Sequence, residues 1–220
     1  MNTGNKTSRI LGLAFLLQFI TSFSSGVFVR PQWYVNGDMA ASLLKIAARP
    51  WLLQANILMD MLTALGVTFL GAVLYITLRK ENEKIALTAF GFYILEGALL
   101  AVSRMATFSL IGISQKFATS GGSATLLILG NLAFDSMDYV GGTLHMLAFC
   151  FGGILFYSLL YKSGAVPRAL SLWGLVTVFP MLVGTLTQIF GTSIPFYYYA
   201  PYIPFELVIG IWILVKGIKA

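Results

Sequence analysis

The chain has 220 residues, of which 58% are hydrophobic and 10% are charged. Adding the 22 glycines brings the apolar share to about two thirds, whereas a soluble globular domain has roughly 45–50% on that measure and about 25% charged residues. These proportions exclude an ordinary soluble protein, and they exclude intrinsic disorder, which requires few apolar residues. The formal net charge of +6 comes from basic residues scattered between apolar runs, which favours membrane topology over a nucleic-acid partner.

The apolar runs predict an all-α fold, a polytopic integral membrane helical bundle that forms a single transmembrane domain over residues 1–220. A hydrocarbon core of about 30 Å takes roughly 20 helical residues to cross. Six transmembrane helices are expected, over about residues 10–29, 51–78, 85–113, 138–161, 169–190 and 199–215. The basic flank of the first run and the small residues near its end leave a cleaved signal peptide open as an alternative.

Three connecting segments carry predictions of their own. Asp38 is a suitable N-cap for a short amphipathic helix over residues 38–48, which we expect to lie flat on the membrane surface. Residues 114–123 are small and polar and include two consecutive glycines, which indicates a loop. Residues 125–134 are apolar but too short to cross, so they either extend the fourth span or form a re-entrant piece.

The distribution of basic residues predicts the orientation. With the amino terminus inside, the cytoplasmic side collects Lys6, Arg9, Arg79, Lys80, Lys84, Lys162, Arg168, Lys216 and Lys219. The opposite side collects Arg30, Lys45, Arg49 and Lys116. We therefore expect both termini to be cytoplasmic.

Six ionisable side chains fall within the predicted spans, all at mid-membrane depth or toward the outer side. They are Asp60, Glu96, Arg104, Asp138, His145 and Glu206. A charge that faces lipid at the bilayer centre costs several kcal/mol, so such residues normally face the bundle interior and one another. Their uneven depth predicts a polar cavity that is open to the outside and sealed toward the cytoplasm.

The charges of this set do not balance. Four carboxyl groups accompany one obligate cation, Arg104, and a histidine of either charge state. A low-dielectric site cannot hold so much net negative charge, so some carboxyls must keep protons, share one, or meet a bound cation. The set therefore predicts a site for a proton-linked or cationic ligand.

Structural roles remain open for each member of the set. Arg104 could pair with Glu96 or Asp60 only to fix helix register. Glu206 follows two prolines and could stabilise the start of a helix, Asp138 could lie in headgroup water, and His145 could be a hydrogen-bonded packing residue.

Three stretches carry a resemblance to a known family. They are "RILGLAFLLQFI", "PWLLQANILMDMLTALGVTFLGAVLYITLR" and "DYVGGTLHMLAFCFGGILFYSLLYKSGAVPRALSLWG". Together they resemble the first two spans and the best-marked stretch of a bacterial six-span membrane family, the domain-of-unknown-function family four-three-eight-six. The resemblance implies a multi-pass protein of the bacterial inner (cytoplasmic) membrane, and it implies no activity.

Two functions from different classes follow as hypotheses, and whether the protein is an enzyme stays open. In the first, the outward-facing cavity binds a small cationic or proton-linked ligand for transport or sensing, with no cofactor. In the alternative, the chain is an intramembrane metal-dependent hydrolase that acts on a lipid or amide substrate from the outer leaflet. His145, Asp138 and either Asp60 or Glu206 would then hold Zn²⁺, although zinc sites usually use two or three histidines or cysteines. Beyond the lipid bilayer and a small ligand, the sequence indicates no partner, and it leaves the oligomeric state open.

Overall fold

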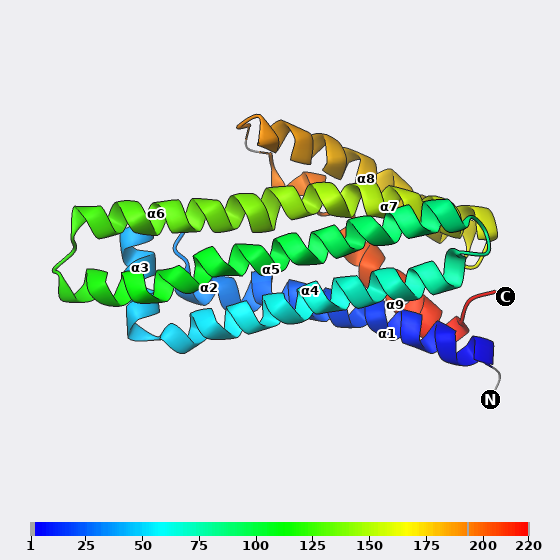
Figure 1. Cartoon of the computed structure of the whole chain (residues 1–220), viewed down its shortest axis with the longest axis horizontal. Coiled ribbons are helices and arrows are strands. Elements are labelled where there is room, and N and C mark those ends of the chain that lie inside the picture. Colours follow the sequence, from blue (N-terminus) through cyan, green and yellow to red (C-terminus); the bar gives the residue numbers. More distant parts are fainter. Residues whose placement is uncertain (1–2, 193, 220) are drawn as a thin grey trace.

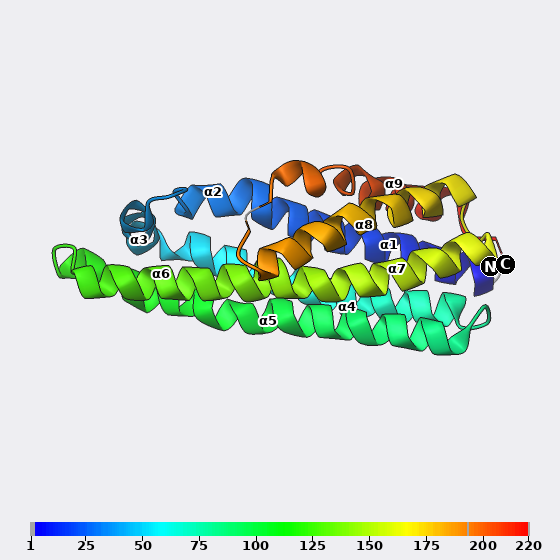
Figure 2. The ribbon, with the colours of Figure 1, turned by 90° about the horizontal axis from the view of Figure 1, so that it is seen from above.

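The computed structural model describes residues 3–192 and 194–219, and these residues form an all-helical bundle (Figure 1). The elements in chain order are α1 (Thr3–Ser24), the π-helical segment η1 (Ser25–Val29), α2 (Arg30–Trp33), α3 (Met39–Ala48), α4 (Pro50–Leu78), α5 (Glu83–Thr119), α6 (Ala124–Asp138), the π-helical segment η2 (Tyr139–Leu144), α7 (His145–Ser163), α8 (Arg168–Ile189), the 3-10 turn η3 (Phe196–Tyr198) and α9 (Ile203–Lys216). The long helices run side by side along one axis, as the second view shows (Figure 2). Both ends of the chain lie at the same end of the bundle.

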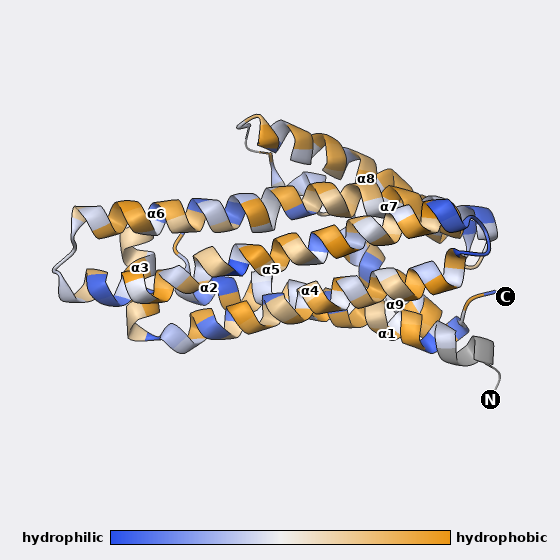
Figure 3. Ribbon diagram, viewed as in Figure 1, coloured by the Kyte–Doolittle hydropathy of each residue, from blue (hydrophilic) through white to orange (hydrophobic). Residues whose placement is uncertain are grey.

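Five helical segments of the described residues are long and apolar enough to cross a membrane. They are Thr7–Trp33, Pro50–Leu78, Glu83–Thr119, Ala124–Ser163 and Arg168–Ile189. Hydrophobic residues dominate the length of these helices, and hydrophilic residues gather at the end that carries the termini (Figure 3). The prediction of an all-α bundle is thereby confirmed, and the length and apolarity of these helices agree with a place in the membrane.

Two helical segments are much longer than a bilayer requires. α5 has 37 residues and the continuous stretch Ala124–Ser163 has 40, which correspond to about 55 and 60 Å at 1.5 Å per residue, against a hydrocarbon core of about 30 Å. The loop predicted over residues 114–123 is therefore mostly wrong, because α5 continues to Thr119. The small polar residues of this segment are compatible with a helix. The chain turns only at Gly121 and Gly122, whose φ angles are +68° and +92°.

The predicted start of the fourth span at residue 138 is also wrong. The helix begins at Ala124 and passes through Asp138 into η2 and α7. Residues 125–134 thus extend the fourth span, which was one of the two alternatives. The Asp138 carboxylate lies within this continuous helical stretch and forms an ion pair with Arg30 of α2.

The amphipathic helix predicted after Asp38 is present as α3. The Ala41 amide donates to the Asp38 carboxylate at 2.8 Å, so the predicted N-cap is confirmed. Leu43 and Ile46 are buried where α3 packs against α5 and α6, whereas Leu44 is exposed. α3 crosses the bundle near the end opposite the termini, and the turn between α5 and α6 projects beyond it (Figure 1).

The last helix is shorter than predicted. α9 begins at Ile203 rather than at residue 199, and its 14 residues span about 21 Å, in the half of the bundle nearest the termini (Figure 1). Pro204 occupies the first helical turn, where a missing N–H costs nothing. Glycines let α9 approach α1 closely, since a Cβ on Gly12 would come within 2.7 Å of the Leu214 backbone nitrogen.

Candidate functional site

A cavity of about 470 Å³ lies between two apolar clusters of the bundle. The terminal cluster, at the end that carries the termini, has as its largest members Phe15, Leu74, Tyr93, Phe156, Tyr157 and Phe205. The distal cluster, at the end covered by α3, consists of Trp33, Met39, Leu43, Ile46, Leu52, Leu53, Leu110, Phe117, Phe134 and Met137. This volume falls within the range of small-molecule sites, which is about 300–1,000 Å³.

The position of the cavity follows from the order of residues along each long helix. On α4, the cavity-lining Asp60 lies between Leu53 of the distal cluster and Leu74 of the terminal cluster. On α5, the lining residues follow Tyr93 and precede Leu110. Apolar residues therefore lie toward both ends of the bundle, and polar residues of several helices face one another in between.

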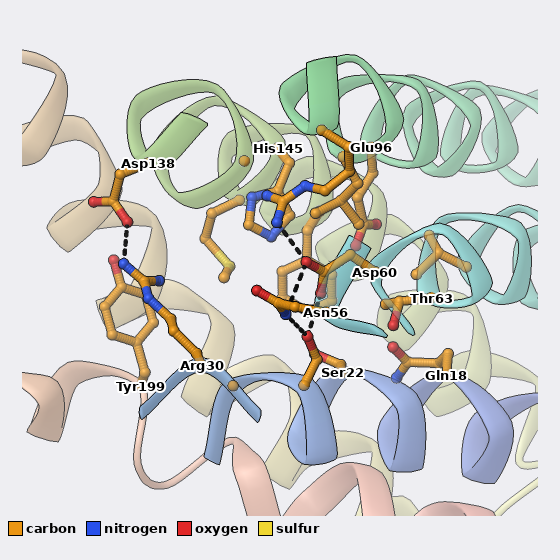
Figure 4. Close-up of a pocket in the computed structure, with 18 of the residues that line it drawn as sticks. Gln18, Ser22, Arg30, Asn56, Asp60, Thr63, Glu96, Asp138, His145 and Tyr199 are labelled. Atoms are coloured by element: carbon orange, nitrogen blue, oxygen red, sulfur yellow. Dashed lines mark hydrogen bonds and ion pairs between the residues drawn. The ribbon is translucent and has the colours of Figure 1, made fainter. Parts of the chain in front are cut away.

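All six ionisable residues predicted for the site line this cavity. They come from five elements: Asp60 from α4, Glu96 and Arg104 from α5, Asp138 from α6, His145 from α7 and Glu206 from α9. Figure 4 shows Asp60, Glu96 and His145 directed toward the same space. The structure also adds Arg30, which sequence analysis placed outside the spans.

Asp60 and Arg104 form an ion pair in the wall of the cavity, between α4 and α5. Their side chains are 16% and 11% exposed. The Asp60 carboxylate also accepts hydrogen bonds from the Ser25 hydroxyl at 2.5 Å and the Asn56 amide at 3.3 Å, and Arg104 donates from Nε to the Ser103 hydroxyl at 3.0 Å. Of the two partners considered for Arg104, the structure selects Asp60, and the pair is well satisfied.

The second ion pair joins Arg30 of α2 to Asp138 of α6 at 2.9 Å. Here the side chains are 37% and 53% exposed, so this pair lies at the mouth of the cavity. The Arg30 guanidinium also lies over the rings of Tyr34 and Phe134, at 5.3 and 5.4 Å from their centres. Sequence analysis missed this residue because it falls just beyond the predicted end of the first span.

Both π-helical segments border this mouth. η1 ends directly before Arg30, and η2 begins directly after Asp138. Single π turns inside long helices are frequent at functional sites. Gly141 of η2 has a local reason to be glycine, because a Cβ there would overlap the Arg104 guanidinium and the Ser103 hydroxyl.

Glu206 lies in the first turn of α9 and has two donors. The Gln18 amide donates to its Oε1 atom at 2.7 Å and the Tyr202 hydroxyl donates to the same atom at 2.9 Å. The Tyr157 hydroxyl lies 2.5 Å from that of Tyr202, which extends this polar chain into the terminal cluster. An acid in the first turn also interacts favourably with the helix dipole, so the structural role considered for Glu206 fits its position as well.

Glu96 has a different environment. Its side chain faces the cavity from α5 and is 5% exposed, and its buried Oε2 atom has no hydrogen-bond partner within the described part of the chain. The buried Nδ1 atom of His145 likewise has none among residues 3–192 and 194–219. Buried polar atoms in native proteins are nearly always paired, so these two atoms need an explanation.

The charge count of the cavity changes when Arg30 is included. Four carboxyls now accompany two arginines, and each arginine pairs with one aspartate. Among the residues that the structure describes, ion pairs leave Glu96 and Glu206 without a cation. The excess acid predicted from the sequence is therefore located on these two glutamates.

The zinc site of the alternative hypothesis is not assembled in the described residues. In that part of the chain, no three His, Cys, Asp or Glu side chains group closely enough to hold a metal ion. Asp138 and Asp60, two of the proposed ligands, are each held by an arginine. Because a catalytic zinc usually has three protein ligands, the geometry does not favour the hydrolase.

The fold and the cavity define an all-helical bundle with helices of membrane-spanning length and a polar cavity between them. Within that class, the chain belongs to the family described as Domain of unknown function (DUF4386), whose model matches residues 10–217. No curated protein and no solved structure matches the chain.

Proposed function

We propose that the cavity binds a small organic cation, and that Glu96 and Glu206 recognise its positive charge. The observation that carries this proposal is the buried, unpartnered Oε2 atom of Glu96 in a cavity whose two arginines are already paired. An ammonium group offers the positive charge that both carboxylates lack and the N–H donors that Glu96 lacks.

The walls of the cavity favour an organic cation over a bare metal ion. Cations such as Ca²⁺ take six to eight oxygen ligands, whereas this cavity is lined by aromatic and thioether side chains as well as by carboxylates. Tyr199, Tyr202 and Phe149 present rings to it, and Met146 and Met181 present flexible, polarisable side chains. Aromatic faces attract organic cations, and a volume of about 470 Å³ accommodates one with several carbon atoms.

We propose the following placement in the membrane for this function. Both termini and the basic turns between α4 and α5 and between α7 and α8 face the cytoplasm, α9 is a sixth, half-length insertion, and the cavity opens to the outside of a bacterial inner membrane. The shared position of the two termini supports an even number of insertions (Figure 1). The irregular chain before α9 borders the cavity through Tyr199 and Tyr202, as is typical of non-helical backbone at membrane depth.

Calorimetric titration of the purified protein in lipid nanodiscs tests the binding proposal. The probes are ethylammonium, tetramethylammonium and butane-1,4-diammonium chlorides, with neutral alcohols of matching size and sodium chloride as controls. We expect at least one organic cation to bind, and Glu206→Gln to weaken its binding by at least about tenfold, because truncating one partner of a buried charge pair costs roughly 2–5 kcal/mol.

Glu81 supplies a matched control, since it is an exposed glutamate on the turn between α4 and α5, outside the cavity. Glu81→Gln should leave the affinity unchanged. Equal binding by the wild type and by the double variant Glu96→Gln/Glu206→Gln would contradict the proposal.

A further inference from the structure

The two glutamates that lack an arginine differ in their hydrogen-bond donors. Glu206 receives hydrogen bonds from Gln18 and Tyr202 on one carboxylate oxygen. Oε2 of Glu96 is buried and receives none from any described residue. Donors stabilise the ionised form of a carboxyl group, so the structure is suited to an anionic Glu206.

A buried carboxylate without donors or a counter-ion is strongly disfavoured, and such a group stays neutral by keeping its proton. Glu96 meets both conditions for neutrality. Glu206, the other acid of the cavity without an arginine partner in the described residues, would repel a second negative charge on Glu96. Two carboxyl groups that share a buried site are therefore expected to hold one proton between them. Because the Gln18 and Tyr202 donors stabilise an ionised Glu206, that proton is expected on Glu96.

The groups around Glu96 do not offer it another source of positive charge. Arg104, on the same helix, is engaged by Asp60 of α4. His145 of α7 faces the cavity beside Arg104, and its Nδ1 has no acceptor in the described residues, so an imidazolium there would bury an unsatisfied donor. The remaining titratable neighbours are a thiol and three phenols, which carry no positive charge in either protonation state: Cys150 and Tyr157 of α7, Tyr93 of α5 and Tyr202 before α9.

We propose that Glu96 carries a proton in the ligand-free protein and that an organic cation bound between Glu96 and Glu206 displaces it. The carboxylic acid loses its O–H proton to solvent, and the resulting carboxylate pairs with the ammonium group, so the cavity exchanges one cation for one proton. This exchange rests on the proposed cation binding and makes that binding proton-coupled. A membrane protein with such a site can use a proton gradient to drive the cation across the bilayer.

Infrared spectroscopy of the ligand-free protein tests the resting proton without any ligand. The carbonyl stretch of a protonated carboxylic acid is separate from the bands of carboxylates. Of the four glutamates, Glu81 and Glu83 are exposed, so labelling all glutamates with ¹³C at the carboxyl carbon isolates the two cavity acids. We expect a protonated band at neutral pH that shifts with the label, disappears in Glu96→Gln and persists in Glu206→Gln.

If Glu96→Gln fails to fold, the shift of the wild-type protonated band on glutamate labelling still shows that a cavity glutamate carries a proton. Glu96→Asp then supplies a second variant, in which the protonated carboxyl band should no longer shift when glutamates are labelled. Absence of a labelled protonated band, or its persistence in Glu96→Gln, would overturn the proposal.

Calorimetric titration with ethylammonium, tetramethylammonium and butane-1,4-diammonium in buffers of different ionisation enthalpy then measures the protons released. We expect about one proton per cation bound and an affinity that rises up to about tenfold per pH unit. Glu96→Gln should release none and bind independently of pH. Binding without proton release would overturn the exchange and leave the proposed function intact, whereas absence of binding by all three cations would overturn both.

Discussion

The half of the cavity toward the distal cluster and the half toward the terminal cluster each contain two carboxyl groups. The two halves differ in whether these carboxyl groups form ion pairs with arginines. Toward the distal cluster, Asp60 and Asp138 each have an arginine, and Asp60 has two further donors. Toward the terminal cluster, neither Glu96 nor Glu206 forms an ion pair with an arginine within the described residues, although Glu206 accepts two hydrogen bonds. The paired aspartates therefore join helices to one another, whereas the glutamates without an arginine are the acids that we assign to ligand binding.

The largest effect should come from breaking the buried pair in the distal half. Arg104→Met leaves the Asp60 carboxylate without its counter-ion in a nearly buried site. Removal of one partner of a buried ion pair typically costs about 3–5 kcal/mol, so we expect the free energy of unfolding in mixed micelles to fall by that amount.

The double variant Asp60→Asn/Arg104→Met removes both charges and should recover part of this loss. An equal loss in the single and double variants would show that the methionine disrupts packing and that the buried charge is not the cause. The comparison of the two halves would then lose its electrostatic basis.

In the terminal half, Tyr202 supports the glutamate that we assign as ionised. Tyr202→Phe removes one of the two donors to Glu206 and also the hydrogen bond between the Tyr202 and Tyr157 hydroxyls. Hydrogen bonds to charged groups contribute about 1.5–3 kcal/mol, so unfolding measured in the same micelles should require that much less free energy. Tyr197→Phe, at an exposed tyrosine, is the matched control and should have no effect.

Close packing beside Glu96 is the next test. A Cβ on Gly97 would lie 2.5 Å from the Thr68 hydroxyl and 2.8 Å from the Ala64 carbonyl oxygen of α4. Gly97→Ala should therefore push α5 from α4 and destabilise the protein by about 1–3 kcal/mol. Gly112, on the same helix, has open space around its Cβ position, so Gly112→Ala should stabilise by about 0.5–1 kcal/mol. Equal effects in the two unfolding measurements would refute this account.

Much of the fold was predictable because membrane helices follow a simple rule of length and apolarity. The five long segments and α3 with its Asp38 cap all appear in the sequence as apolar runs with polar ends. Apart from the late start of α9, the errors fall where helices continue beyond the length of a bilayer. There α5 and α6 bury residues such as Phe117 and Phe134 in the distal cluster with α3, a tertiary contact that a search for spans cannot detect.

The candidate site was predictable as a set of residues but not as a set of pairs. The cost of a buried charge identifies Asp60, Glu96 and Glu206 from one sequence. Which acid meets which arginine depends on how the helices pack, so Arg30 was missed. Ser25 was missed as well, because a neutral polar residue in a span gives no comparable signal.

The mouth pair should show the smallest effect. Arg30→Gln removes the partner of Asp138, but both side chains are more than one third exposed, and exposed ion pairs contribute about 1 kcal/mol or less. We expect a loss of unfolding free energy below about 1 kcal/mol, which becomes smaller still at 1 M salt, where the screening length is about 3 Å. Asp138→Asn should give a similar value, and the Arg104→Met loss should hardly respond to salt, because that pair is nearly buried. A salt-insensitive Arg30→Gln loss as large as that of Arg104→Met would mean that the mouth is closed to water, and the cavity would then need a different entrance for its ligand.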